Sequence, residues 1–315
     1  MSDQAEKLRR LSKATIVESN AAAGHVPMVV VAGARNGVGA TTVACNMAAA
    51  IADRGERVLL VDAVEGTNDL AEMAGVARSI EYCVPDIVSG KCGLVDAMID
   101  GPMGLYVVAN GRRVGTPHDR DARRPSSAGG ESSRAGLQRL LGAIDALRSD
   151  IDLVVVDAGS ALTAWTRRLW MQARCVVLVT TADDPAVMDA YAAIKSLSLD
   201  GIRPAVRLLV NRELNGAAAE DAQRRVQNAC QKFLSLSIEA LPALPLHGDD
   251  FAASALGGPR VWEEPNSAFG RATLWLGRAV SEVLAKSPAP SSVAAFSPVT
   301  PIEMFMQATT RVAAF

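Results

Sequence analysis

The sequence predicts an α/β fold in which helices cover both faces of a mainly parallel sheet. Short apolar runs recur along the chain, and segments with helical spacing separate them. Strands that are apolar throughout are buried on both faces, as in parallel sheets whose connections are helices. With 315 residues, of which 49% are hydrophobic, the chain can bury a core of this size.

Six apolar runs have the length of strands, and five segments have the spacing of helices. We expect strands at residues 28–32, 58–61, 105–109, 153–156, 175–180 and 206–210. We expect helices at residues 41–54, 136–149, 185–199, 221–233 and 268–285. Together these elements predict one doubly wound domain over residues 25–285.

Four segments lie outside this pattern. Residues 1–24 are polar and predict a short helix followed by a tether, and residues 112–135, rich in Arg, Ser and Gly, predict an exposed loop. Residues 286–299 are rich in Ser, Pro and Ala and predict a linker. Residues 300–315 begin with Thr-Pro-Ile-Glu, a helix-capping sequence, and predict a C-terminal amphipathic helix.

The composition favours a cytoplasmic protein. The net charge of −2 at pH 7 gives no overall attraction to nucleic acid or to anionic membranes. The five cysteines are scattered without metal-ligand spacing, as reduced thiols are. The polar first residues do not resemble a secretory signal, and no run reaches the roughly 18 apolar residues of a membrane span. We therefore expect no specific nucleic acid as a partner.

A glycine-rich segment, GARNGVGATT at residues 33–42, follows the first apolar run and opens the first helix. Such glycines let successive backbone N–H groups point at one anion beside a helix N-terminus. Gly39 and Thr41 fit the end of the general phosphate-loop pattern G-x-x-x-x-G-K-[ST], and Gly33 lies one residue before the place of its first glycine. Position 40, a lysine in that pattern, is alanine. Losing a charge-assisted phosphate contact costs about 1.5–3 kcal/mol, so we expect weak phosphate binding.

This loop resembles the deviant Walker A loop of the MinD/ParA family, K-G-G-x-G-K-[ST]. In that family the first lysine crosses a dimer interface to the partner's nucleotide, and the second holds the β- and γ-phosphates. Arg35 and Ala40 stand at these two places. The resemblance implies a sheet of seven or eight strands, a homodimer, and ATP or ADP bound with Mg²⁺. The residues that it places at the nucleotide are Gly33, Arg35, Asn36, Gly37, Val38, Gly39, Ala40, Thr41, Thr42, Asn211 and Arg212.

Three further segments resemble the family. Asp62 matches the first acid of a D-x-D segment, and Val64 replaces the second acid, which positions the attacking water. Asp157 matches the acid that orients the Mg²⁺ hydration shell, and Asn211 matches an asparagine that reads adenine. The resemblance thus makes Asp62 and Asp157 the catalytic candidates and adds Thr41 as a third Mg²⁺ residue. Without the lysine and the second acid, we expect weak or absent nucleotide binding and little turnover.

Other segments resemble the FlhG group of this family, which regulates flagellar number and placement. The sequence TTADDPAVMDAYAAIK at residues 180–195 and DIVSG at residues 86–90 are similar to FlhG segments, and the whole likeness covers residues 27–285. Residues 3–9 match the FlhG activator motif D-Q-A-x-x-L-R. In that group this helix stimulates FlhF, a GTPase of the signal-recognition type. The residues expected to contact such a partner are Asp3, Gln4, Ala5, Leu8, Arg9 and Leu11.

The C-terminal helix has an apolar stripe that includes Ile302, Phe305 and Met306. MinD-type proteins bind membranes through such a helix, which would place the chain peripherally at the inner face of the membrane or at the cell pole. Arg311 is its single basic residue, so attraction to anionic lipid is small. Membrane contact and docking on the domain or on a partner groove therefore both stay open.

Three functions compete at this point. The first is an FlhG-like regulator that acts on an FlhF-type GTPase and uses ATP poorly. The second is a functional dimerising ATPase in which Arg35 replaces the lysine. The third is a polar positioning scaffold resembling the BcsQ or CpaE/TadZ groups, whose loops carry similar substitutions.

Overall fold

The computed structural model contains one sheet of eight strands. It describes residues 25–64, 69–111, 130–199, 205–247 and 258–286, without the side chains of residues 130–133, 199 and 286. The strands are β1 (Met28–Gly33), β2 (Val58–Asp62), β3 (Ile99–Asp100), β4 (Leu105–Val108), β5 (Leu153–Asp157), β6 (Cys175–Thr180), β7 (Val206–Val210) and β8 (Glu239–Ala240). Their order is β3-β4-β2-β5-β1-β6-β7-β8, and all neighbours are parallel except β3 and β4. The predicted mainly parallel sheet is confirmed.

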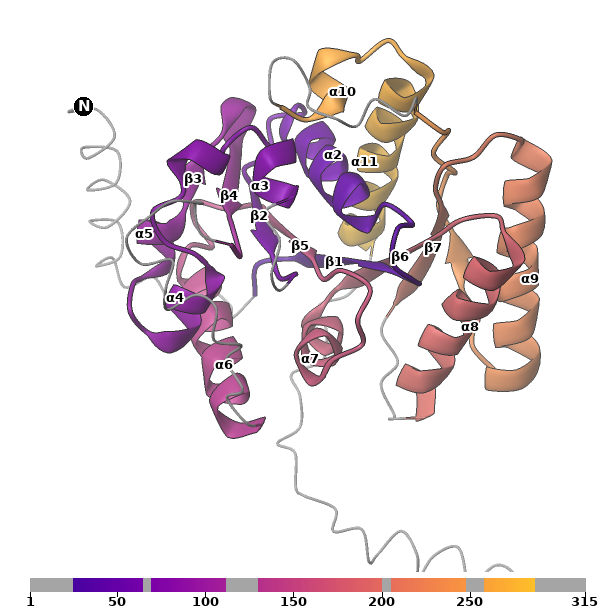
Figure 1. Cartoon of the computed structure of the whole chain (residues 1–315), viewed down its shortest axis with the longest axis horizontal. Coiled ribbons are helices and arrows are strands. Elements are labelled where there is room, and N and C mark those ends of the chain that lie inside the picture. The colour runs from indigo at the N-terminus through magenta and orange to yellow at the C-terminus, as the bar shows by residue number, and fades with distance from the viewer. Residues whose placement is uncertain (1–24, 65–68, 112–129, 200–204, 248–257, 287–315) are drawn as a thin grey trace, which may run out of the picture.

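Helices lie on both faces of this sheet (Figure 1). They are α2 (Ala40–Ala52), α3 (Asp69–Met73), α4 (Val84–Ser89), α5 (Leu94–Ala97), α6 (Gly130–Ala146), α7 (Ala164–Gln172), α8 (Asp184–Leu199), α9 (Gly216–Leu234), α10 (Arg260–Glu263) and α11 (Ala268–Lys286). Two short 3₁₀ turns, η2 (Ala77–Ser79) and η3 (Pro102–Gly104), complete the connections. The long helices α2 and α11 pack on one face, whereas α6, α7, α8 and α9 cover the other.

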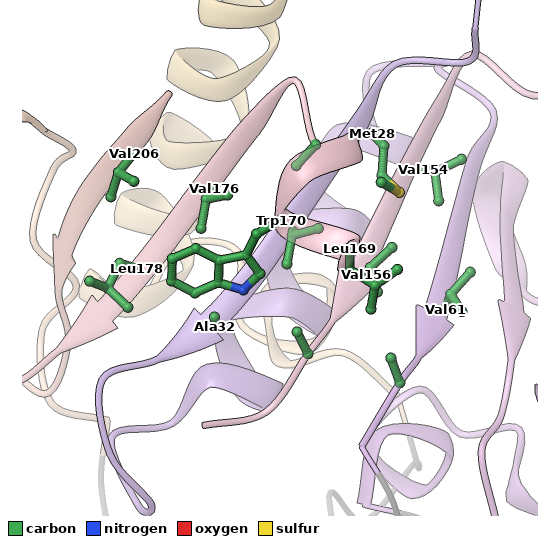
Figure 2. Packing of buried hydrophobic residues seen from close by; sticks show 14 of the residues in the cluster. Met28, Ala32, Val61, Val154, Val156, Leu169, Trp170, Val176, Leu178 and Val206 are labelled. Carbon is green, nitrogen blue, oxygen red and sulfur yellow. The ribbon is translucent and has the colours of Figure 1, made fainter. Parts of the chain in front are cut away.

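Alternation along each strand divides the core into two layers. Val29 and Val31 of β1 belong to the layer under α2 and α11, while Met28 and Val30 belong to the layer under α6 to α9. Successive strand side chains point to opposite faces, so a strand that is apolar at every position supplies both layers. Figure 2 shows the second layer, where the buried indole of Trp170 lies across β6 and β1. Because the central strands are packed on both faces, the residues at their carboxyl ends are held in defined positions.

The expected strands and long helices are present, with shifted boundaries. The helix expected from residue 136 begins at Gly130, so residues 130–135, which the sequence placed in an exposed loop, are helical. Arg134 and Ala135 are exposed, so this early part of the helix has no apolar face from which the sequence could have predicted it. The helix expected from residue 221 begins at Gly216, because the Asn215 side chain accepts a hydrogen bond from the Ala217 N–H. Lys286, expected in the linker, ends α11.

Several predictions fall outside the described residues. These are the N-terminal helix of residues 1–24, most of the 112–135 loop, and the linker and C-terminal helix after residue 286. Their roles in partner or membrane contact stay predictions. Among the helices that the structure does describe, none is both long and apolar enough to cross a bilayer.

Candidate nucleotide site

The glycine-rich segment joins β1 to α2 at the carboxyl end of the central strand. We call residues 33–42 the phosphate loop. Gly37 and Gly39 have φ values of 82° and 84°, a region that side chains with a Cβ rarely adopt. At Gly39 a Cβ would also lie 2.5 Å from the Asn211 amide nitrogen. The tight curl of the loop therefore depends on glycine at this position.

The end of β7 supports the loop from one side. Asn211 is buried, and its Nδ2 donates a hydrogen bond of 2.8 Å to the Val38 carbonyl. Arg212, in the left-handed region with φ 59°, points its guanidinium back to the Gly37 carbonyl at 3.4 Å. The structure thus brings both sequence-predicted residues to the loop, where they hold its backbone. That Asn211 reads adenine stays a prediction.

Two buried carboxylates stand beside the loop at the ends of neighbouring strands. Asp62 of β2 and Asp157 of β5 are partners in the parallel register and are 1% and 0% exposed. Asp62 Oδ1 accepts from the Val64 N–H at 2.9 Å, and Asp157 Oδ1 accepts from the Gly159 N–H at 3.1 Å. Within the described part of the chain, the second oxygen of each carboxylate is buried without a hydrogen-bond partner.

The pKa values of this pair reflect its burial. Burial raises the pKa of Asp62 to about 7, and the neighbouring Asp157 carboxylate adds to the rise against the Val64 hydrogen bond. Burial also raises the pKa of Asp157, while a hydrogen bond with the Thr41 side chain opposes the rise. Two close buried acids without a cation hold protons more tightly than free acids do.

These residues fit a magnesium ion. The orphaned oxygens of Asp62 and Asp157 and the Thr41 hydroxyl are oxygen ligands of the kind that Mg²⁺ prefers, and water and phosphate oxygens would have to complete its six-coordinate shell. The described residues hold no cluster of three or more acidic, His or Cys side chains that could cage a metal alone. Bound Mg²⁺ would offset the charge of the phosphates. The Mg²⁺ roles of Thr41, Asp62 and Asp157 stay predictions that this geometry supports.

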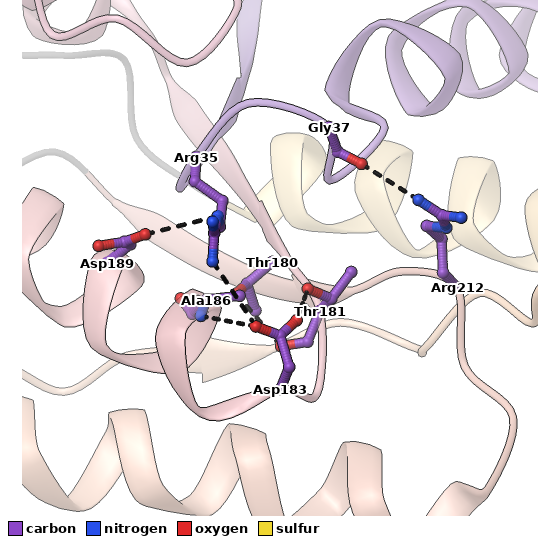
Figure 3. A network of polar contacts seen from close by, with 8 residues as sticks. All are labelled: Arg35, Gly37, Thr180, Thr181, Asp183, Ala186, Asp189 and Arg212. Carbon is purple, nitrogen blue, oxygen red and sulfur yellow. Dashed lines mark hydrogen bonds and ion pairs between the residues drawn. The ribbon is translucent and has the colours of Figure 1, made fainter.

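The phosphate side of the site is different. A cleft of about 520 Å³ lies between the loop, the start of α8 and the β7–α9 turn, and residues lining it include Arg35, Arg212, Ala182, Leu214 and Leu246. Ala40 is buried in the apolar layer under α2 and extends nothing toward an anion. Figure 3 shows that Arg35 contacts Asp183 and Asp189, and that Arg212 contacts Gly37. Both cations among the cleft-lining residues are therefore engaged by the protein itself.

Sequence patterns did not predict three contacts of the phosphate loop: those of Arg35 with Asp183 and Asp189, and that of Asn36 with Ser160. Asp183 and Asp189 lie far along the chain from Arg35, and only the packing of β6 beside β1 brings them to the loop. The Ser160 hydroxyl likewise bonds the Asn36 side chain across the top of β5. Val64, which replaces the expected acid, lies against Gly159. A Cβ added at Gly159 would lie 3.1 Å from a methyl carbon of Val64.

A phosphate loop after β1 of a mainly parallel sheet, with acids at the ends of the next two strands on one side, β5 and β2, defines a P-loop nucleotide-binding protein. A family model described as an AAA domain matches residues 26–198, which is more than half of the chain. The chain belongs to this family and, within it, to the MinD/ParA type.

Similar proteins agree with this assignment. The chain is 26% identical over 227 residues to the antiactivator FleN of Pseudomonas aeruginosa, covering 70% of this chain and 74% of FleN. It is 26% identical over 249 residues to the septum site-determining protein MinD of Synechocystis, covering 78% and 85% of the two chains. Its fold is similar to MinD complexed with Mg-ADP from Pyrococcus horikoshii, with a TM-score of 0.62, 20% identity, and coverage of 82% and 98%.

Proposed function

We propose that this MinD/ParA-type protein is a regulator of the FlhG kind, which controls flagellar number or placement through an FlhF-type GTPase. In this proposal it binds ATP or ADP weakly with Mg²⁺ and hydrolyses ATP slowly. Its similarity to a protein named an antiactivator favours regulation over substrate turnover.

The observation that carries the nucleotide half of the proposal is the absence of a free cation at the phosphates. Of the described residues that line the cleft, Arg35 is paired with acids and Arg212 is bonded to the loop backbone. Ala40 of the phosphate loop is buried in the apolar core. Phosphoryl transfer depends on positive groups that stabilise charge on the transferred phosphate. Asp62 and Asp157 remain for Mg²⁺, so some nucleotide affinity is retained.

The partner half rests on the sequence of residues 3–11. Asp3 can cap a helix that Glu6 closes, and Gln4, Leu8 and Leu11 then share one face. Two leucines can anchor in a groove, and the Gln4 amide can both donate to and accept from a water at a nucleotide. A separate helix on a tether is able to act whatever the state of the phosphate loop.

The partner half is tested on GTP hydrolysis by the cognate FlhF-type GTPase. We expect the full chain to accelerate phosphate release, and a peptide of residues 1–20 to accelerate it alone. Gln4→Ala should return the rate to that of the GTPase by itself, whereas Leu8→Ala should require a higher concentration for the same effect. If neither the chain nor the peptide changes the rate, the regulatory role through this GTPase is wrong.

The nucleotide half is tested by ATP turnover and by titration with ATP and ADP. We expect turnover near background and weak binding. Brisk turnover with ATP-dependent dimer formation, both lost in Arg35→Ala, would instead establish the dimerising ATPase in which Arg35 replaces the lysine.

A further inference from the structure

Asn36 gives the phosphate loop a side chain at a place where the family motif K-G-G-x-G-K-[ST] has glycine. The residue is exposed and lines the cleft. Its φ lies outside the left-handed region that favours glycine, so the backbone at this position does not require glycine. The substitution therefore keeps the path of the loop and adds an amide group near its tip.

Ser160 holds this amide in one orientation. The Ser160 hydroxyl donates a hydrogen bond to Asn36 Oδ1, which turns the amide nitrogen to the opposite side. Within the described part of the chain, that nitrogen makes no hydrogen bond. Two N–H groups of an exposed, oriented side chain can therefore donate to an anion.

Ser160 belongs to the metal side of the site. It lies in the segment that directly follows Asp157, whose carboxylate accepts from the Gly159 N–H at 3.1 Å. The Gly159 carbonyl in turn accepts from the Gly33 N–H at 2.8 Å. The bond between Asn36 and Ser160 thus joins the phosphate loop to the segment behind a Mg²⁺ candidate.

Hydrogen bonds also brace this segment from its other end. Thr163 caps α7 by accepting from the Thr166 N–H at 3.2 Å, and the Thr166 hydroxyl donates to the Ala161 carbonyl at 2.7 Å. Arg167 Nη2 donates to the Ser196 hydroxyl of α8 at 2.9 Å. Ser160 therefore sits in a loop of defined shape, and a donor that is already oriented needs little reorganisation to bind an anion.

We propose that Asn36 donates to the terminal phosphate of a nucleoside triphosphate and that Ser160 is the positioning residue that orients it. The inference deepens the proposed function and rests on it, because it assigns a neutral donor to a loop in which Ala40 supplies no charge. Asn36 then determines specificity, since a diphosphate lacks the group that it contacts.

The location of the pair favours the outermost phosphate over the inner ones. Backbone N–H groups at the start of α2 suit the inner phosphates, and Mg²⁺ is held by the outer two. Asn36 lies near the tip of the loop, away from the start of α2, and is bonded to the segment behind Asp157. A neutral hydrogen bond of this kind changes an equilibrium by about three- to tenfold.

The test measures the affinity of full-length proteins for ADP and for AMPPNP, a triphosphate that is not hydrolysed, by calorimetric titration with Mg²⁺. Its readout is the ratio of the AMPPNP affinity to the ADP affinity. Asn36→Ala should lower this ratio about three- to tenfold. Asn36→Asp keeps an oxygen for the Ser160 hydroxyl but replaces the N–H groups by a negative oxygen, so it should lower the ratio further. The same substitutions are made in Ala40→Lys, where we expect tighter binding.

Two further comparisons separate positioning from a general effect on the site. Ser160→Ala should lower the ratio less than Asn36→Ala does, and Ser160→Thr, which keeps the hydroxyl, should restore it. Asn215→Ser is the matched control: Asn215 lines the cleft at the β7–α9 turn, and serine also caps helices, so the start of α9 is kept. This control should change both affinities by the same factor.

The outcomes distinguish this inference from the proposed function. If ADP binds and the ratio is unchanged in Asn36→Ala, the role of Asn36 is wrong and the proposed function stands. A higher ratio in Asn36→Ala would also overturn the role, because the side chain would then obstruct the terminal phosphate. If neither the unaltered chain nor Ala40→Lys binds ADP or AMPPNP, the proposed nucleotide role is wrong and this inference falls with it.

Discussion

The metal side and the phosphate side of the candidate site are built differently. Asp62 and Asp157 are buried in the sheet, aligned by the register of β2 and β5, and each carries an oxygen that the described residues leave without a hydrogen bond. On the phosphate side Ala40 packs into the core, while Arg35 and Arg212 bond to neighbouring protein groups at the surface. The metal side therefore has oxygens without hydrogen-bond partners among the described residues, whereas the cations of the phosphate side already contact the protein.

This difference shows which parts of such a site the fold requires. Ala40 is the first residue of α2 and packs in the apolar layer, and alanine has the highest helix propensity, so this part of the loop has no structural need for lysine. The buried acids, in contrast, carry unfavourable desolvation that a cation would relieve. A ligand group at the rim can therefore be lost with little effect on stability, whereas the acids couple ligand binding to stability.

The largest effect should appear in the pH dependence of stability. Asp62 titrates near its ordinary value of 3.8 when unfolded and at about 7 when folded. Between these values the folded protein holds a proton that the unfolded chain releases. The free energy of unfolding should therefore fall as pH rises from about 4 to 7, by as much as about 4 kcal/mol.

Urea unfolding at pH 5 and pH 8, in unaltered protein and in Asp62→Asn, measures this slope. The variant should have a shallower slope and should gain stability at pH 8, and Mg²⁺ should stabilise the unaltered protein more at pH 8 than at pH 5. Asp152→Asn is the control, because the Arg57 hydrogen bond lowers the pKa of this exposed acid and it cannot produce the same slope. Identical slopes in Asp62→Asn and unaltered protein would show that Asp62 is charged throughout.

The next effect concerns the phosphate side. Ala40→Lys should tighten ADP and ATP binding by about 1.5–3 kcal/mol, or roughly ten- to hundredfold, because it restores a charge-assisted contact to phosphate. Ala40→Met, which adds length without charge, should not tighten binding. Adding Val64→Asp to Ala40→Lys should raise ATP turnover above that of Ala40→Lys alone. Unchanged affinity in Ala40→Lys would mean that the phosphates do not lie at this loop.

The smallest effects should distinguish the two residues at the end of β7. Asn211→Ala removes a buried hydrogen bond to the Val38 carbonyl and should lower the free energy of unfolding by about 1–3 kcal/mol. Arg212→Ala removes an exposed bond of 3.4 Å and should change it by less than about 0.5 kcal/mol. Equal losses in chemical denaturation would show that Asn211 does not support the loop.

The sequence was sufficient for the parts that local patterns determine. Apolar runs located the main strands, and the resemblance of two segments to the MinD/ParA family identified Asp62 and Asp157, which the register of β2 and β5 places side by side. The contacts of Arg35 were not predictable, since a pair of exposed acids on α8 has no sequence signature until β6 is known to lie beside β1. The two-residue strands β3 and β8 are too short to show alternation.

Those two short strands have a consequence for how this protein meets other chains. Across the described residues they form the outer members of the sheet, and neither presents more than two residues for pairing. Long exposed strands invite strand addition and aggregation, whereas short ones offer little backbone to pair with. Growth of the sheet sideways from one molecule to the next is therefore disfavoured. Any association between two copies would therefore have to use surfaces other than the edges of this sheet.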